Sequence, residues 1–453
     1  MAQKGKKRRR LKKKVRRGCM SMLALVVLIS LLAVYKCRQG AHGDDEVLPV
    51  AVADSLPDAR DSLLAFRLAK AVSSTPRIDS SRVGMMVFDL THRSPVFSHR
   101  SDRLMVPASC QKLLTALSVL HRLGATHSFV SQLYMQGEPA DSVLYGSLLL
   151  VADDDPLIYS FEGFAQAIQR KGIRRIEGDV FFDLARYDTL RPHPSAPAWD
   201  IPYRILAPLF RGEEAVRRDF IATLASFGIR LHRNPLFADR WLEGLSRKDY
   251  PHQYALASKA AQLRSHEVFR VEHSLREVLA PMLIYSDNAM AEAVYHHADH
   301  SMARWSASRG EDGQTMESFI RDELEGLVPE GMTAVDGSGL SPLNATTAEF
   351  LVQLLKYAYD KPALRDELIG YLLATPHHDE RFGTLWGRRF DERFRERLYC
   401  KTGTLTARGI SSLAGYLHSE DGRWYAFAIL NEGTPVYEAR EFQDAVCRSL
   451  LEH

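Results

Sequence analysis

Apolar residues are spaced along this chain in two different ways, and each spacing predicts one type of secondary structure. Apolar runs of five to eight residues bounded by turn residues predict β-strands, and they occupy residues 83–90, 95–99, 147–152, 177–183, 398–405, 411–418 and 423–430. Apolar residues three and four positions apart predict helices, and they occupy residues 109–123, 161–172, 213–228, 274–299, 345–359, 362–373 and 439–451. The sequence therefore predicts an α/β fold of the mixed α+β kind.

The order of these elements predicts an interrupted domain. Strand patterns lie at both ends of the chain, and neither 57–130 nor 273–453 looks complete alone. Residues 131–272 carry their own strand and helix patterns, and four prolines mark a loop over 190–205. We therefore expect 57–130 and 273–453 to form one discontinuous domain, with 131–272 inserted as a smaller domain.

The N-terminal region has a separate character. Residues 4–17 hold eleven Lys and Arg and no acidic residue, and the uncharged stretch 18–35 follows. As a helix this stretch would rise about 27 Å, which is close to the hydrocarbon thickness of a bilayer. The pattern predicts a basic cytoplasmic tail with a membrane anchor or signal segment over 1–37 and a linker over 38–56, and the poor cleavage context favours an anchor.

Charge and cysteine content limit the remaining classes of function. The chain has 59 Lys and Arg against 56 Asp and Glu, so that without the eleven basic residues of the tail its net charge is −8. This balance and the adjoining apolar stretch argue against nucleic-acid binding. Five scattered cysteines do not make a disulfide framework, and a bridge between Cys110 and Cys400 is a minor alternative to two core residues.

One short motif, "SCQK" at 109–112, places a serine at the start of a helical pattern and a lysine one turn later. A serine hydroxyl needs a base to become a nucleophile, and positions i and i+3 share a helix face, so Lys112 can reach Ser109. Burial and a cationic neighbour such as Lys401 would favour the neutral amine. The alternative is a helix-capping serine followed by a solvent-facing lysine.

Two further motifs follow in order, "SDN" at 286–288 and "KTG" at 401–403. Ser286 can pass a proton between Lys112 and a leaving amine, and Asn288 can hydrogen-bond Lys112 and a substrate amide. In the predicted strand 398–405, Lys401 and Thr402 can bind a terminal carboxylate, and Gly403 lets a substrate approach closely. The N–H groups of Ser109 and Thr404 can together stabilise an oxyanion.

These motifs resemble those of the class C low-molecular-mass penicillin-binding proteins, which are serine D-Ala-D-Ala carboxypeptidases and endopeptidases. The resemblance runs from about residue 83 to the C-terminus and includes "LYGSLLLVADDDP" (144–156), "DGSGLSPLNATT" (336–347) and "FGTLWGRR" (382–389). The segment 196–210 follows the family only loosely, and the spacing between the first two motifs favours one inserted domain.

The resemblance implies a penicilloyl-serine transferase (β-lactamase/transpeptidase-like) domain with one insert. It also implies cleavage of peptidoglycan stem peptides through an acyl-enzyme on Ser109, without metal or other cofactor, and inhibition by β-lactams. The expected location is the cell envelope, with the catalytic domain in the periplasm and residues 18–35 in the membrane. Carboxypeptidase and endopeptidase action are not distinguished.

Three alternatives remain open at this stage. Glu292, His296 and His300 lie four residues apart on a predicted helix, a spacing compatible with zinc binding, although a solvated helix face is more ordinary. A membrane-tethered penicillin-binding scaffold with weak turnover is a second alternative. A β-lactamase, which would deacylate rapidly, is a third.

Overall fold

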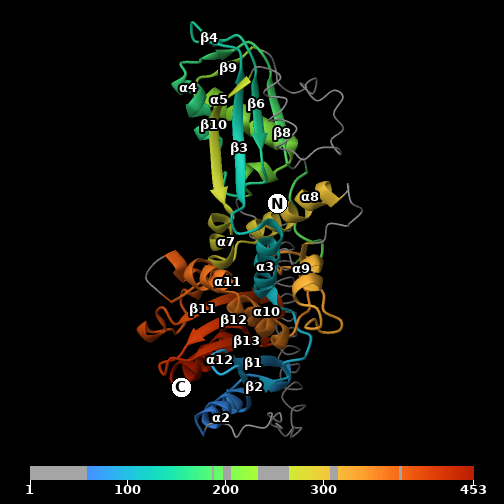
Figure 1. Cartoon of the computed structure of the whole chain (residues 1–453), viewed down its shortest axis with the longest axis vertical. Coiled ribbons are helices and arrows are strands. Elements are labelled where there is room, and N and C mark those ends of the chain that lie inside the picture. The colour runs from blue at the N-terminus through green and yellow to red at the C-terminus, as the bar shows by residue number, and fades with distance from the viewer. Residues whose placement is uncertain (1–58, 186–187, 197–205, 233–264, 307–314, 377–379) are drawn as a thin grey trace, which may run out of the picture. The chain divides into compact units, whose positions relative to one another are not determined.

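The computed structural model describes residues 59–185, 188–196, 206–232, 265–306, 315–376 and 380–453 (Figure 1). The predicted tail, membrane segment and linker, residues 1–56, lie outside these ranges. Within them, no helix combines the length and the apolar character that crossing a bilayer would need.

A five-stranded antiparallel sheet forms the larger layer of the fold (Figure 1). Its strand order is β11 (Leu398–Leu405), β12 (Ile410–His418), β13 (Trp424–Asn431), β1 (Val83–Asp89) and β2 (Ser94–His99). The first and last segments of the chain therefore pair in one sheet, and the predicted strands at 83–90, 95–99, 398–405, 411–418 and 423–430 are confirmed.

Helices cover both faces of this sheet, which explains the unbroken apolar runs in its central strands. Every residue of β1 is buried, with Met86 and Phe88 facing one core and Met85 and Val87 the other. The first core includes α3 (Gln111–Leu123), α7 (Leu275–Ile284), α8 (Asn288–Ser306), α9 (Thr315–Glu323) and α10 (Ala348–Asp360). The second core includes α2 (Ala59–Ser74) and α12 (Val436–Leu451).

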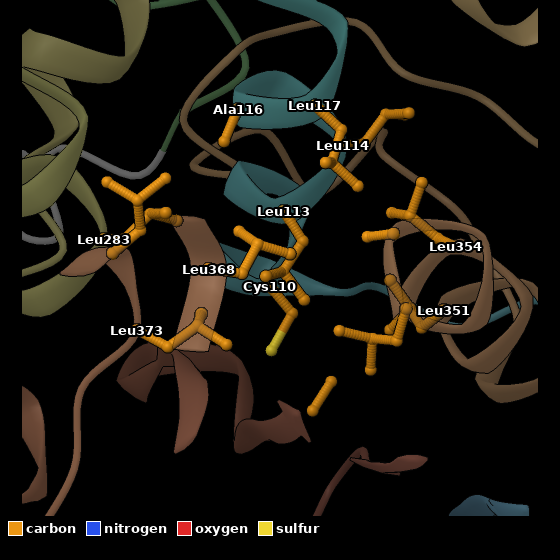
Figure 2. Close-up of a cluster of buried hydrophobic side chains, with 14 of the residues drawn as sticks. Cys110, Leu113, Leu114, Ala116, Leu117, Leu283, Leu351, Leu354, Leu368 and Leu373 are labelled. Atoms are coloured by element: carbon orange, nitrogen blue, oxygen red, sulfur yellow. The ribbon is translucent and has the colours of Figure 1, made fainter. Parts of the chain in front are cut away.

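The start of α3 is anchored in the first core. Figure 2 shows Cys110, Leu113 and Leu117 of this segment among leucines from other elements, including Leu283 of α7 and Leu354 of α10. Burying a leucine side chain of this kind contributes about 2 kcal/mol. The core therefore fixes the helix that carries the first motif.

Two smaller sheets are built from the segment predicted as an insert. One has the order β10 (Ser265–Ser274), β3 (Ser128–Gln136), β6 (Leu148–Ala152) and β8 (Val180–Leu184). The other joins β4 (Pro139–Ala140), β5 (Val143–Leu144), β7 (Arg175–Ile176) and β9 (Arg230–Leu231). The helices α4 (Glu162–Arg170) and α5 (Glu213–Ser226) share a separate core with residues of both sheets, including Leu133 of β3 and Ile176 of β7.

The strands β3 and β10 pair antiparallel across both predicted domain boundaries, from Ser128↔Ser274 to Gln136↔Ser265. They enter and leave the segment side by side, as a chain inserted into another domain requires. The division into 57–130 with 273–453 and 131–272 stays a prediction.

Some expected elements differ in the structure. The pattern over 274–299 is two helices, α7 and α8, because Ser286 adopts a left-handed φ of 61° between them. The pattern over 362–373 divides into α11 (Pro362–Glu367) and a π-helical turn, η7 (Leu368–Leu372). The helices α2 and α9 and the strands β3, β4, β5, β7, β9 and β10 were not predicted.

Candidate active site

Ser109 lies in a short 3₁₀ turn, η2 (Ala108–Cys110), directly before α3 begins at Gln111. The hydroxyl of Ser412 on β12 donates to the carbonyl oxygen of Pro107 at 2.6 Å, which ties this turn to the sheet. Ser109 makes no capping hydrogen bond to η2 or α3. The helix-cap alternative is therefore wrong, and the hydroxyl has a different partner.

That partner is Lys112, whose Nζ lies 3.0 Å from Ser109 Oγ. Lys112 Nζ also lies 2.6 Å from Asn288 Oδ1 and 2.6 Å from the carbonyl oxygen of Ser338. Amide and carbonyl oxygens only accept hydrogen bonds. A neutral amine has two N–H groups, so donation to these two oxygens leaves its lone pair for the Ser109 hydroxyl.

The surroundings of Lys112 also favour the neutral amine. The side chain is fully buried, and burial followed by the neighbouring charge of Lys401 lowers its pKa to about 7. Asp336, Glu292 and Asp287 act in the opposite direction and raise the pKa. Near neutral pH a large fraction of Lys112 can therefore accept a proton.

The second motif bridges α7 and α8, and its three residues are placed differently. Asn288 is the first residue of α8 and contacts Lys112. Asp287 Oδ1 accepts a hydrogen bond from the backbone N–H of Met290 at 2.8 Å, so Asp287 fixes the turn. Ser286 is half-buried, and within the described part of the chain no hydrogen bond joins its hydroxyl to Ser109 or Lys112.

The third motif lies on β11, beside the turn that carries Ser109. A Cβ atom on Gly403 would lie 3.0 Å from Ser109 N and 2.6 Å from the oxygen of Pro107. Only glycine therefore lets the strand approach the nucleophile this closely. The thiol of Cys110 also contacts the strand, donating to the carbonyl oxygen of Lys401 at 3.2 Å.

The third motif and the residue that follows it, Thr404, provide a cation and two hydroxyl groups. Lys401 is fully buried, burial lowers its pKa to about 8, and its Nζ donates to the carbonyl oxygen of Thr402 at 2.7 Å. The Thr402 hydroxyl lies 2.7 Å from that of Thr384, and Arg440 Nη2 lies 3.3 Å from Thr404 Oγ1. This arrangement gives a positive edge beside Ser109, suited to an anionic group.

Sequence reasoning missed the contribution of the loop Asp336–Asn344. The loop supplies the Ser338 carbonyl oxygen to Lys112, and Asp336 accepts a hydrogen bond from Gly339 N at 2.6 Å. "DGSGLSPLN" contributed only to the resemblance, because a carbonyl oxygen leaves no side-chain signature. The hydroxyl of Ser195, in the predicted loop 190–205, lies 2.6 Å from that of Ser341.

The disulfide alternative does not fit the structure, and Glu292 has backbone partners. Cys110 and Cys400 are both buried free thiols and contribute to different cores, so no bridge joins them. Glu292 accepts hydrogen bonds from Gly337 N and Ser338 N. Among the described residues no group of three His, Cys, Asp or Glu is arranged to hold a metal ion, and the side chain of His300 lies outside them.

Comparisons with known proteins agree with this arrangement. The D-Ala-D-Ala carboxypeptidase 3 (S13) family matches residues 64–211 and 252–452. The chain is 24% identical to a D-alanyl-D-alanine carboxypeptidase of Actinomadura sp. (strain R39) over 460 residues, covering 84% of each chain.

Solved structures share the fold at low sequence identity. Penicillin-binding protein 4 from Haemophilus influenzae is 15% identical, with a TM-score of 0.58 over 86% of this chain and 99% of that one. A second structure of that protein, in complex with a β-lactam, has a TM-score of 0.55 over 85% of this chain and all of that one, also at 15% identity. A predatory endopeptidase from Bdellovibrio bacteriovorus is 14% identical, with a TM-score of 0.51 over 81% of this chain and 93% of that one. The predicted α/β penicillin-binding fold is confirmed, and the chain belongs to the D-Ala-D-Ala carboxypeptidase 3 (S13) family of serine peptidases.

Proposed function

We propose that the protein is a serine-type D-Ala-D-Ala carboxypeptidase and endopeptidase that cleaves peptidoglycan stem peptides through an acyl-enzyme on Ser109. The observation that carries this proposal is the 3.0 Å contact between Lys112 Nζ and Ser109 Oγ, with Asn288 and Ser338 accepting from the same amine. A base in hydrogen-bond reach of a serine hydroxyl is the arrangement that nucleophilic catalysis requires.

In the acylation step, Lys112 accepts the Ser109 proton as Oγ attacks the carbonyl carbon of the penultimate D-alanine. The N–H groups of Ser109 and Thr404 stabilise the negative charge on the carbonyl oxygen. Lys112 then returns the proton, through the Ser286 hydroxyl, to the leaving amine. The C–N bond breaks, D-alanine or the cross-linking residue departs, and an ester links the remaining peptide to Ser109.

In the deacylation step, a water molecule attacks the ester while Lys112 accepts one of its protons. The C–O bond breaks, Ser109 regains its proton from Lys112, and the shortened peptide leaves with a new carboxylate. Lys401 and Thr402 bind the terminal carboxylate of the substrate during acylation, because a buried cation beside the nucleophile favours an anion there.

The same site accounts for β-lactams as covalent inhibitors, because the strained amide of a β-lactam presents a carbonyl carbon and a carboxylate in similar positions. A peptidoglycan substrate places the active domain in the cell envelope. The basic tail and the apolar stretch 18–35 support anchoring in the cytoplasmic membrane with the catalytic domain on the periplasmic side.

Digestion of purified peptidoglycan, with product masses read for released D-alanine and for opened cross-links, tests the proposal. A fluorescent penicillin provides the second measurement: wild type forms a stable adduct, and Ser109→Ala forms none. Equal labelling of the two proteins, or no labelling of wild type, would contradict the role of Ser109 and favour the scaffold alternative. Rapid consumption of the antibiotic without a stable adduct would favour a β-lactamase.

A further inference from the structure

The carboxylate of Glu292 is almost completely buried behind Lys112, on α8, one turn after Asn288. Its Oε1 accepts a hydrogen bond from Ser338 N at 2.9 Å, and its Oε2 accepts a longer one from Gly337 N at 3.4 Å. A carboxylate can satisfy two neighbouring N–H groups in this way, whereas an amide side chain can accept on one side only. The two N–H groups favour the ionised form of Glu292, against burial and then the neighbouring charge of Asp336, which raise its pKa to about 7.

A second carboxylate, that of Asp336, holds the next backbone N–H group along the same loop. Asp336 Oδ1 accepts from Gly339 N at 2.6 Å, and this N–H belongs to the same peptide unit as the Ser338 carbonyl group. In a trans peptide unit the N–H and C=O groups point in opposite directions. Holding the N–H of Gly339 therefore directs the Ser338 oxygen away from Asp336, toward Lys112 Nζ at 2.6 Å.

Helix α3 fixes the other side of the loop. Thr115 Oγ1 donates to the carbonyl oxygen of Gly337 at 2.6 Å, one turn after Lys112 on the same helix. Gly339 has a φ of +79°, and a Cβ atom there would lie 1.9 Å from the oxygen of Ala108. The loop is thus held against both the nucleophile turn and the base by its backbone.

We propose that Glu292 and Asp336 are positioning residues of the proposed hydrolase: they hold three successive backbone N–H groups, so that the Ser338 carbonyl oxygen accepts one N–H of Lys112. With Asn288 accepting the other, the lone pair of the amine points at Ser109. Without the two carboxylates the carbonyl group can turn away, and Lys112 can donate to Ser109 Oγ instead of accepting its proton. This inference rests on the proposed function of Ser109 and Lys112.

The two carboxylates also act on Lys112 through their charge. Both raise its pKa, against the lowering by burial and by Lys401. The charged and titratable groups that face the pair Lys112 and Glu292 are Asp287, Tyr295, His296, Asp336 and Lys401. Removing one negative charge while Lys401 remains lowers the pKa of Lys112, so the rise of activity with pH moves to lower pH.

The test measures the second-order rate constant for acylation by a fluorescent penicillin, from pH 5 to pH 9, in full-length Glu292→Gln and Asp336→Asn proteins. We expect each rate constant at its plateau to fall on the order of tenfold to a hundredfold, as small displacements of a base do. We also expect the midpoint of the acid limb to move to lower pH. A purely structural role would reduce the fraction of protein that reacts, without changing the rate constant or the midpoint.

Two further variants separate a positioning role of Glu292 from a general effect of losing a buried or hydrogen-bonded carboxylate. Glu213→Gln removes a carboxylate that accepts two N–H groups from Arg217, at 2.6 and 3.0 Å, and should leave rate and midpoint unchanged. Glu292→Asp keeps the carboxylate on a shorter side chain, so the midpoint of the acid limb should stay while the acylation rate constant falls. This variant also tests the role of Glu292 if Glu292→Gln does not fold. Wild-type rate and midpoint in the Glu292 variants would overturn this inference alone, whereas absence of any acylation in wild type would overturn it together with the proposed function.

Discussion

Two fully buried lysines flank Ser109, and the regions around them differ in the acceptors and charges that they offer. Lys112, on the helix side, lies close to three oxygen atoms and three carboxylates raise its pKa. Lys401, on the strand side, donates to the oxygen of Thr402, and no carboxylate of the described chain contributes to its pKa. The hydrogen bonds of Lys112 are thus used within the protein, whereas Lys401 keeps N–H groups and an uncompensated charge for a ligand.

This comparison supports the proposed division of roles, with proton transfer by Lys112 and anion binding by Lys401. The same residue type performs both tasks because hydrogen-bond partners and nearby charges differ, although burial lowers the pKa of each, to about 7 for Lys112 and about 8 for Lys401. Exchanging or removing either amine tests the assignment.

The largest effect is expected for Lys112→Met, which removes the base and keeps most of the side-chain volume. Acylation by a fluorescent penicillin should slow by about 10³-fold, within the range ascribed to general bases. Circular dichroism controls for folding. A rate constant close to that of wild type would show that Lys112 does not deprotonate Ser109.

Lys401→Met should have a smaller effect that depends on the substrate. For a peptide ending in a free D-Ala carboxylate, kcat/KM should fall by about 10²-fold, because a hydrogen bond between charged groups contributes about 2 to 3 kcal/mol. The matching C-terminal amide lacks the anion, so its slower turnover should change little. Equal losses with both peptides would contradict anion binding by Lys401.

The pH dependence of kcat/KM should have two limbs that belong to different lysines. Activity should rise through about pH 7, because Lys112 must lose its proton, and fall above about pH 8, because Lys401 must keep its own. In Lys401→Met the alkaline limb should disappear. Its acid limb should move to higher pH, because the neighbouring positive charge that lowers the pKa of Lys112 is gone.

An unchanged acid limb in Lys401→Met would show that the two lysines do not interact. The carboxypeptidase reaction on a soluble stem peptide is suited to this measurement, because initial rates of D-alanine release can be followed across the whole pH range.

The smallest effect is expected for Cys110→Ala, at the residue that connects the two regions. Burial raises the pKa of this thiol, so it remains protonated and donates to the oxygen of Lys401. Its loss should reduce the free energy of unfolding by about 1 kcal/mol, measured by urea titration. Acylation should stay of the same order as in wild type, and a large loss would assign the thiol a chemical role.

Sequence reasoning reached the parts of the site that depend on local spacing. The contact of Ser109 with Lys112 follows from one helical turn, and β11 follows from the apolar pattern around Lys401. The contact of Lys112 with Asn288 was expected from the three motifs that occur in order along the chain, and no periodicity predicts it.

The remaining parts of the site depend on tertiary contacts of the backbone. The Ser338 oxygen reaches Lys112 because Asp336 and Glu292 hold neighbouring N–H groups, and a sequence records none of these directions. The spacing of Glu292 from His296 along the sequence suggested a zinc site. The hydrogen-bond partners of Glu292, Gly337 N and Ser338 N, lie in another segment and have no such spacing. The predicted start of a helix at Ser109 was wrong by two residues, because Ala108 adopts a left-handed φ of 47° and a 3₁₀ turn precedes α3.

The position of β11 at the edge of its sheet has a consequence for selectivity. Ala374 pairs with Cys400 near the beginning of the strand, and beyond that point the outer edge of β11 pairs with no strand in the described ranges. A peptide laid along Thr402–Thr404 would be recognised mainly by its amide groups. Recognition through amide groups depends little on the side chains of the peptide, so peptides that differ in those side chains would bind this edge with similar affinity.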